Sequence, residues 1–195
     1  MNTTTTNAPP RDFQKQVIDL IDDLKSVCAS YGLGNDGNEF KIITQVFLYK
    51  FINDKFAYEI KKIAPALETA ESWEDALRAY DPEDYEMLLL ELPPDTAKLY
   101  PRHFISTLFA RQNKADFAVL FDSTLLDIAA INGDIFSVKT GGGAKIRLFD
   151  ELSKFIVDEG IRDNFCIALT NKLVEFSFEQ IFRIGTRSSI HNLSR

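Results

Sequence analysis

Two histidines and two cysteines are the side chains of this 195-residue sequence with the clearest capacity for catalysis or metal binding. Two histidines are too few for a multi-histidine metal site. His103 follows Arg102 at a predicted helix start and is interpreted as an ordinary surface or capping residue, and His191 lies in a polar tail. Cys28 and Cys166 occur in helical patterns without CxxC spacing, which predicts buried, reduced thiols. A Ser-His-Asp or Cys-His group could still assemble in space, but no GxSxG motif anchors one.

A glycine triplet at residues 141–143 invites comparison with phosphate-binding loops. It matches neither the GxxxxGK pattern of P-loops nor the GxGxxG pattern of dinucleotide-binding folds. Lys139, Lys145 and Arg147 surround it and form the best local basic cluster of the sequence. Basic side chains can contact the DNA backbone, which positions a protein without reading base sequence. We therefore predict a flexible loop with Lys139, Lys145 and Arg147 as DNA-backbone contacts; weak anion binding at a helix start is the alternative.

Neighbouring carboxylates are common, but none lies in an apolar setting that would separate their pKa values, as acid–base catalysis requires. Such pairs include Asp22-Asp23, Glu83-Asp84 and Asp158-Glu159. Residues 68–95 are strongly acidic and are interpreted as a solvated face. The residues alone therefore do not indicate an enzyme. A helical hydrolase that uses dispersed carboxylates together with His103 is the alternative from the enzyme class.

The elements that must hold these residues are predicted to be helices, because apolar residues recur at helical spacing and Gly and Pro are scarce,. Apolar spacing and breakers predict helices at about 12–30, 39–63, 72–80, 83–92, 101–109, 114–131, 145–158, 162–175 and 178–184. Ile135, Phe136 and Val138 could add a short β element near 135–139. We therefore predict an all-α fold, an irregular multi-helix bundle of about eight or nine helices.

One domain is expected, from residue 11 to residue 185, without internal repeats or β/α alternation. The polar, proline-closed stretch 1–10 predicts a disordered leader, and residues 186–195 predict a frayed tail,. No run is long and apolar enough to span a membrane, and the N-terminus lacks a secretory apolar region. With the two unpaired cysteines, these features predict a reducing cytoplasm.

The stretch from Glu39 to Tyr58 is the expected centre of the bundle. Its predicted buried face is apolar and aromatic: Phe40, Ile43, Val46, Phe47, Phe51 and Ile52, widened by Tyr49, Phe56 and Tyr58. A helix this aromatic on one side needs other elements to cover it.

Charge is unevenly distributed along the chain. Residues 1–100 hold 10 Lys and Arg against 18 Asp and Glu, a balance of −8, and residues 101–195 hold 12 against 11, a balance of +1. No basic tail or stripe indicates nucleic-acid binding. Contact with DNA must therefore be local or be supplied by a partner.

The central stretch also carries a family resemblance. Residues 39–43 read EFKII, and residues 47–56 read FLYKFINDKF, with Asn53 where the family often has serine. In this order and spacing, the segment resembles the N-terminal helical domain of the DNA methyltransferase (modification) subunit of type I restriction–modification systems. Residues 121–126, FDSTLL, and residues 178–185, FEQIFRIG, are similar to later parts of that domain, so the resemblance covers nearly the whole chain.

The resemblance implies a non-catalytic module of an adenine-N6 DNA methyltransferase subunit, with a role in phage defence. Its implied partners are the DNA specificity subunit, the methyltransferase catalytic domain, the restriction subunit and double-stranded DNA within the complex. S-adenosylmethionine is expected in the catalytic domain, which has a Phe-x-Gly-x-Gly loop and an Asn/Asp-Pro-Pro-Phe/Tyr motif that holds a flipped adenine.

Neither family motif occurs in this sequence. Pro9-Pro10 follows Ala8, Pro93-Pro94 lies between Leu92 and Asp95, and Lys139-Thr140 precedes the glycine triplet. We therefore expect no catalytic, cofactor-binding or metal-binding residues in this chain. The sequence departs from the family pattern after Gly185. A stand-alone truncated regulator, or decoy, that competes for the specificity subunit is the alternative function.

Overall fold

The computed structural model describes residues 11–35, 37–133, 135 and 148–184. Seven α-helices are present in this part of the chain: α1 (Arg11–Ser30), α2 (Gly37–Ile63), α3 (Trp73–Arg78), α4 (Pro82–Glu91), α5 (Ile105–Arg111), α6 (Phe117–Ile131) and α7 (Arg162–Val174). Residues 179–184 are also helical, and four short 3-10 helices occur between the longer elements. The all-α prediction is confirmed, and the described residues contain no strand. Of the predicted β element only Ile135 is described, and it lies in a turn.

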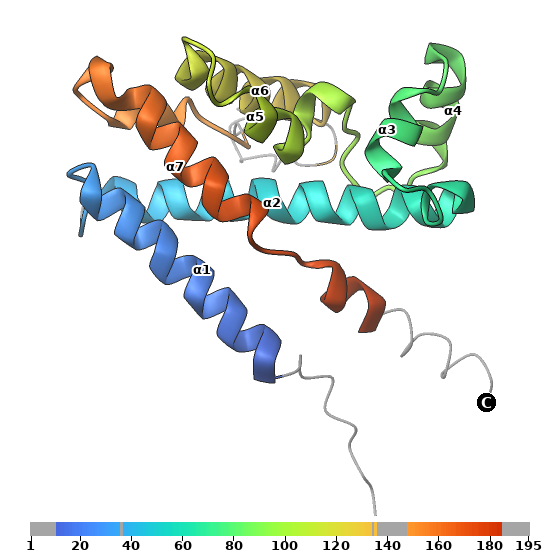
Figure 1. Cartoon of the computed structure of the whole chain (residues 1–195), viewed down its shortest axis with the longest axis horizontal. Helices are drawn as coiled ribbons and strands as arrows, with labels where there is room; N and C mark the ends of the chain where they lie inside the picture. The colour runs from blue at the N-terminus through green and yellow to red at the C-terminus, as the bar shows by residue number, and fades with distance from the viewer. Residues whose placement is uncertain (1–10, 36, 134, 136–147, 185–195) are drawn as a thin grey trace, which may run out of the picture.

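Helix α2 is the axis of the molecule, and at 27 residues it is roughly 40 Å long,. Figure 1 shows α5 and α6 on one side of α2 and α1 on the other, with α7 crossing α2 so that the chain after α7 lies on the α1 side. The pair α3 and α4 lies at the C-terminal end of α2. Helix α7 packs against α1, α2, α5 and α6, so the last long helix closes the bundle.

The buried face of α2 differs from the predicted one. Its fully buried residues follow helical spacing: Ile42, Val46, Tyr49, Ile52, Phe56 and Ile60. Val46, Tyr49, Ile52 and Phe56 were placed correctly. Phe40, however, is 78% exposed, and four other predicted residues are only half-buried: Ile43, Phe47, Phe51 and Tyr58. The reason is that α2 carries two apolar stripes. The second, through residues 40, 43, 47 and 51, looks equally apolar in sequence but lies toward one side of the bundle.

The second stripe is covered only along part of its length. Phe178 packs edge-on against Phe47 at 5.0 Å and against Phe51 at 5.5 Å between ring centroids. Phe182 contacts Phe51 in the same manner at 5.4 Å. The chain after α7 therefore covers the C-terminal half of the stripe and leaves Phe40 exposed.

The helix predicted over residues 101–109 is interrupted. Residues Pro101–His103 form a 3-10 helix, Phe104 is extended, and α5 begins only at Ile105. Two side chains of α2 form hydrogen bonds with backbone groups at this point. Tyr49 Oη donates to the His103 carbonyl at 2.6 Å, and the Ile105 N–H donates to Asn53 Oδ1 at 3.1 Å.

The helix predicted over residues 145–158 is wrong for the part that the structure describes, residues 148–158. Phe149, Leu152 and Ile156 are buried at helical spacing, but only Leu152–Phe155 is helical, as a 3-10 helix. The backbone N–H of Asp150 donates to Gln45 Oε1, and that of Ser153 donates to Asp122 Oδ1. Because these bonds replace the i to i−4 pattern, the segment remains irregular.

Several helices begin close to their predicted bounds, where local caps hold them. Ser72 caps α3 by accepting from the Asp75 N–H, and Asp81 caps α4 ahead of Pro82. Both cysteines are buried and unpaired, as predicted. No helix in the described ranges has the length and apolarity needed to cross a membrane. The predicted leader 1–10 and tail 186–195 lie outside the described residues.

Candidate functional site

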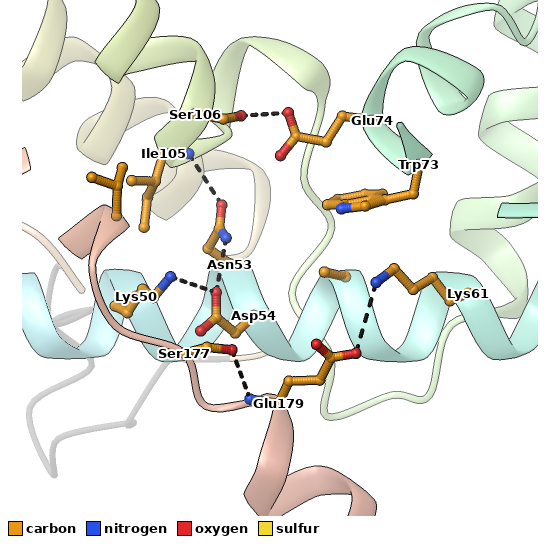
Figure 2. Close-up of a pocket in the computed structure, with 12 residues that line it drawn as sticks. Lys50, Asn53, Asp54, Lys61, Trp73, Glu74, Ile105, Ser106, Ser177 and Glu179 are labelled. Atoms are coloured by element: carbon orange, nitrogen blue, oxygen red, sulfur yellow. Dashed lines mark hydrogen bonds and ion pairs between the residues drawn. The ribbon is translucent and has the colours of Figure 1, made fainter. Parts of the chain in front are cut away.

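A polar hollow lies where several segments meet, and we call it the central hollow. It has a volume of about 270 Å³, and its lining comes from α2, α3, α5, the last residue of α7 and the chain after α7. Figure 2 shows its principal polar side chains, which are Lys50, Asn53, Asp54, Lys61, Glu74, Ser106, Ser177 and Glu179. Trp73 and Ile105 supply apolar walls.

A buried ion pair forms the floor of the central hollow. Lys50 Nζ lies 3.0 Å from Asp54 Oδ1, and both side chains are less than 10% exposed. Asp54 Oδ1 also accepts from the Asn53 amide at 3.1 Å, and Asp54 Oδ2 accepts from the Phe178 N–H at 2.8 Å. Asp54 thus neutralises the lysine and holds the chain after α7 against α2.

The rim of the central hollow is also internally paired. Glu74 accepts from the Ser106 hydroxyl and from Arg78, which joins α3 to α5. Lys61 lies 3.7 Å from Glu179 and 5.5 Å from the centre of the Trp73 ring. The charged groups of the hollow therefore connect helices to one another, and their arrangement serves to fix the bundle.

His103 does not line the central hollow, although the hydrolase alternative requires it to meet a cluster of carboxylates. The ring is 1% exposed. Its Nδ1 accepts from the Tyr100 N–H at 3.1 Å, so Nε2 carries the proton and donates to Asp127 at 2.7 Å. Burial lowers the pKa of His103, an effect that the bond to Asp127 opposes. The predicted capping role is confirmed, but the predicted surface position is wrong.

Asp122 of α6 is a second buried carboxylate, and the sequence did not single it out. Burial raises its pKa, and two bonds from Ser153 act in the opposite direction. The Ser153 hydroxyl donates to Oδ2 at 2.6 Å, and the Ser153 N–H donates to Oδ1 at 3.1 Å. These bonds hold the segment between α6 and α7 in its irregular path, so Asp122 has a structural role.

The second notable hollow is apolar and lies between α1 and α2; we call it the α1–α2 groove. It has a volume of about 600 Å³, and its apolar lining is Ile21, Phe40, Ile43 and Phe47, with Lys25 and Glu39 among the polar residues. Glu39 Oε2 accepts from the Asn35 N–H at 2.9 Å and so fixes the loop that precedes α2. Ile18, also on α1, is 57% exposed.

Phe40, which lines the groove, was predicted to be buried, and this prediction is wrong. Its aromatic character suggested a core position, yet 78% of its surface is accessible. The signal in the sequence was the second stripe on α2, because one bundle cannot bury every side of an apolar helix. Large exposed apolar side chains beside a hollow are typical of interaction sites.

The predicted DNA-backbone contacts Lys139, Lys145 and Arg147 lie outside the described residues. Within the described residues, no group of three or more His, Cys, Asp or Glu side chains is placed to hold a metal ion. Comparison of the chain with models of known protein families, with curated proteins and with solved structures found no match.

Proposed function

We propose that this chain is the non-catalytic N-terminal helical module of a type I restriction–modification adenine-N6 DNA methyltransferase subunit. The sequence resemblance of residues 39–56 supports the proposal, and these residues belong to α2, the axis of the bundle. S-adenosylmethionine and the catalytic residues are assigned to the separate catalytic domain. The module acts through contacts with that domain, with the specificity subunit and with the DNA backbone, and the restriction subunit joins the same complex.

The observation that carries the proposal is the uncovered part of the second stripe on α2. Phe40 is exposed beside Ile43 and Phe47 in the α1–α2 groove, with Ile18 nearby on α1. Aromatic side chains are enriched in the centres of protein interfaces because they bury a large apolar area in one position. We assign this groove to the specificity subunit, which is the principal protein partner in the proposed complex.

Assembly with a specificity subunit and a methyltransferase catalytic core tests the assignment. Phe40→Asp should weaken assembly by about 2 kcal/mol or more if Phe40 is an anchor residue. Val157→Asp is the matched control, because Val157 is 93% exposed and is not among the residues that line the groove. Equal assembly of the two variants would exclude Phe40 as an anchor. Displacement of a full-length subunit by this chain would instead favour the decoy function.

The contact with the DNA backbone rests on Lys139, Lys145 and Arg147. Replacing all three with glutamate should weaken DNA binding by the assembled complex and reduce its dependence on salt, because each phosphate contact releases a counterion. Identical affinity across a salt series would remove these residues from the DNA-binding surface.

A further inference from the structure

We propose that the outer face of α4 is a docking surface for a basic amphipathic helix of a partner protein. This inference is independent of the proposed function, because it concerns the end of the molecule opposite α1 and a different chemistry. It starts from the acidic segment 68–95, which contains ten Asp and Glu residues against one Arg, a balance of −9. The remaining residues together carry +2, since the whole chain is −7.

Helix α4 is held rigidly by its inner face. Leu89 is 1% exposed and Tyr85 is 7% exposed, and α4 packs on α2. The Tyr85 hydroxyl donates to the Leu99 carbonyl at 2.8 Å, and its ring stacks on Tyr100 at 5.7 Å. Asp81 caps the helix start, and the chain leaves at Leu92. The outer face is therefore presented in a fixed orientation.

Two large apolar side chains stand on that outer face. Met87 is 61% exposed and Leu90 is 75% exposed. They are three residues apart and so lie next to each other on the helix surface. Figure 1 shows α4 at the end of the bundle, beside α3 and near the C-terminal end of α2.

Carboxylates surround this apolar pair. Glu83 and Glu91 lie four residues before and after Met87, and Glu86 lies four residues before Leu90, all three exposed. Within the described residues neither Glu83 nor Glu91 forms an ion pair, while Glu86 accepts from the Tyr100 hydroxyl at 2.7 Å. An apolar centre with an acidic rim is complementary to a helix that has an apolar stripe flanked by Lys or Arg. The same charge repels the DNA backbone, so DNA must approach another face.

A synthetic peptide of about four helical turns, with leucine on one stripe and lysine elsewhere, is the probe. Its binding to the whole chain is measured by fluorescence anisotropy in a titration. A second peptide has the same leucine stripe with glutamate in place of lysine, and a third is a scrambled lysine peptide. Only the first should bind, and its affinity should fall as salt rises from about 50 to 300 mM, because screening shortens the reach of the charges.

Substitutions on α4 separate the two contributions. Met87→Ser with Leu90→Ser should reduce affinity about tenfold, as expected for losing an interface anchor, and Val157→Ser is the matched control for an exposed apolar residue. Glu83→Lys with Glu91→Lys should reduce it about tenfold or more through repulsion, and Asp22→Lys on α1 is the control. The four substituted residues of α4 all lie on its exposed face, so their replacement should leave the fold intact. Circular dichroism of each variant checks this.

Three results would overturn the proposal. Binding of the scrambled peptide as tight as that of the amphipathic one, or normal binding by the serine variant, would make the surface a nonspecific acidic face. Equal binding of the glutamate peptide would show that charge does not select the partner.

Discussion

Removing the carboxylate of Asp54 should strongly destabilise the bundle. Asp54 forms an ion pair with Lys50 at 3.0 Å and accepts two hydrogen bonds, from the Asn53 side-chain amide at 3.1 Å and from the Phe178 N–H at 2.8 Å. Asp54→Leu leaves a lysine that is 7% exposed without its counter-charge. Breaking one partner of a buried ion pair costs about 3–5 kcal/mol of folding free energy. For a chain of this size, the melting temperature should fall by roughly 6–20 °C.

The assay is urea unfolding followed by circular dichroism. The double variant Lys50→Met with Asp54→Leu should recover part of the loss, because it no longer buries an unpaired charge. It should retain a cost of about 1–3 kcal/mol from the unsatisfied Phe178 N–H. Hydrogen exchange at that amide should become faster in both variants.

Glu151→Ala is the matched control, since its ion pair with Lys154 is 41% and 61% exposed on the two side chains. The control should cost less than about 1 kcal/mol. A loss below about 1 kcal/mol for Asp54→Leu, with no recovery in the double variant, would refute the description of a buried pair that ties two segments together.

Phe47→Ala should cost about 1–3 kcal/mol in urea unfolding, less than a fully buried Phe, and Phe40→Ala should stay within about 0.5 kcal/mol; the reverse order would invalidate the two-stripe account of α2. The free energy of unfolding should decline as pH falls from about 7 to 5. The folded state lowers the His103 pKa and so favours the neutral ring. The stability that this preference contributes is lost as pH drops through the lowered pKa. A His103→Asn variant with an unchanged pH slope would argue against that assignment. Burial, and to a smaller extent Glu39, raises the pKa of Cys28 to about 11, and burial is the main cause of the raised pKa of Cys166. Both thiols should therefore react with a thiol reagent only after the chain unfolds. Rapid labelling of the native chain would contradict their burial.

Local signals in the sequence were sufficient for the helices and for several of their ends. Ser72 and Pro82 mark helix starts through chemistry that involves only their immediate neighbours, so spacing and residue type predict them. Cys28 and Cys166 follow the same logic, because apolar helical surroundings predict burial. The all-α class follows from many such local signals.

Contacts between distant residues decided the rest. Gln45 bonds Asp150 across 105 residues, and Asp54 bonds the Phe178 N–H across 124. Neither pairing can be recognised from local periodicity. The first lies in the irregular segment where a helix was predicted, and the second lies just before the helical residues 179–184. For the same reason the sequence could not tell which stripe of α2 would be covered, and Phe40 was placed in the core.

The proposed docking surface on α4 shows the same division. The acidic segment 68–95 was recognised from composition, but the exposure of Met87 and Leu90 at its centre depends on how Tyr85 and Leu89 orient α4. The DNA-backbone contact at Lys139, Lys145 and Arg147 stays a prediction.

The most direct test of the proposed function is reconstitution of a type I methyltransferase catalytic core and specificity subunit with and without this chain. Assembly is measured by analytical ultracentrifugation, and DNA affinity is measured by anisotropy at several salt concentrations. The proposal predicts that adding the chain stabilises the assembly and tightens DNA binding, and that Phe40→Asp removes the gain in assembly. Unchanged assembly and unchanged DNA affinity on addition of the wild-type chain would contradict it.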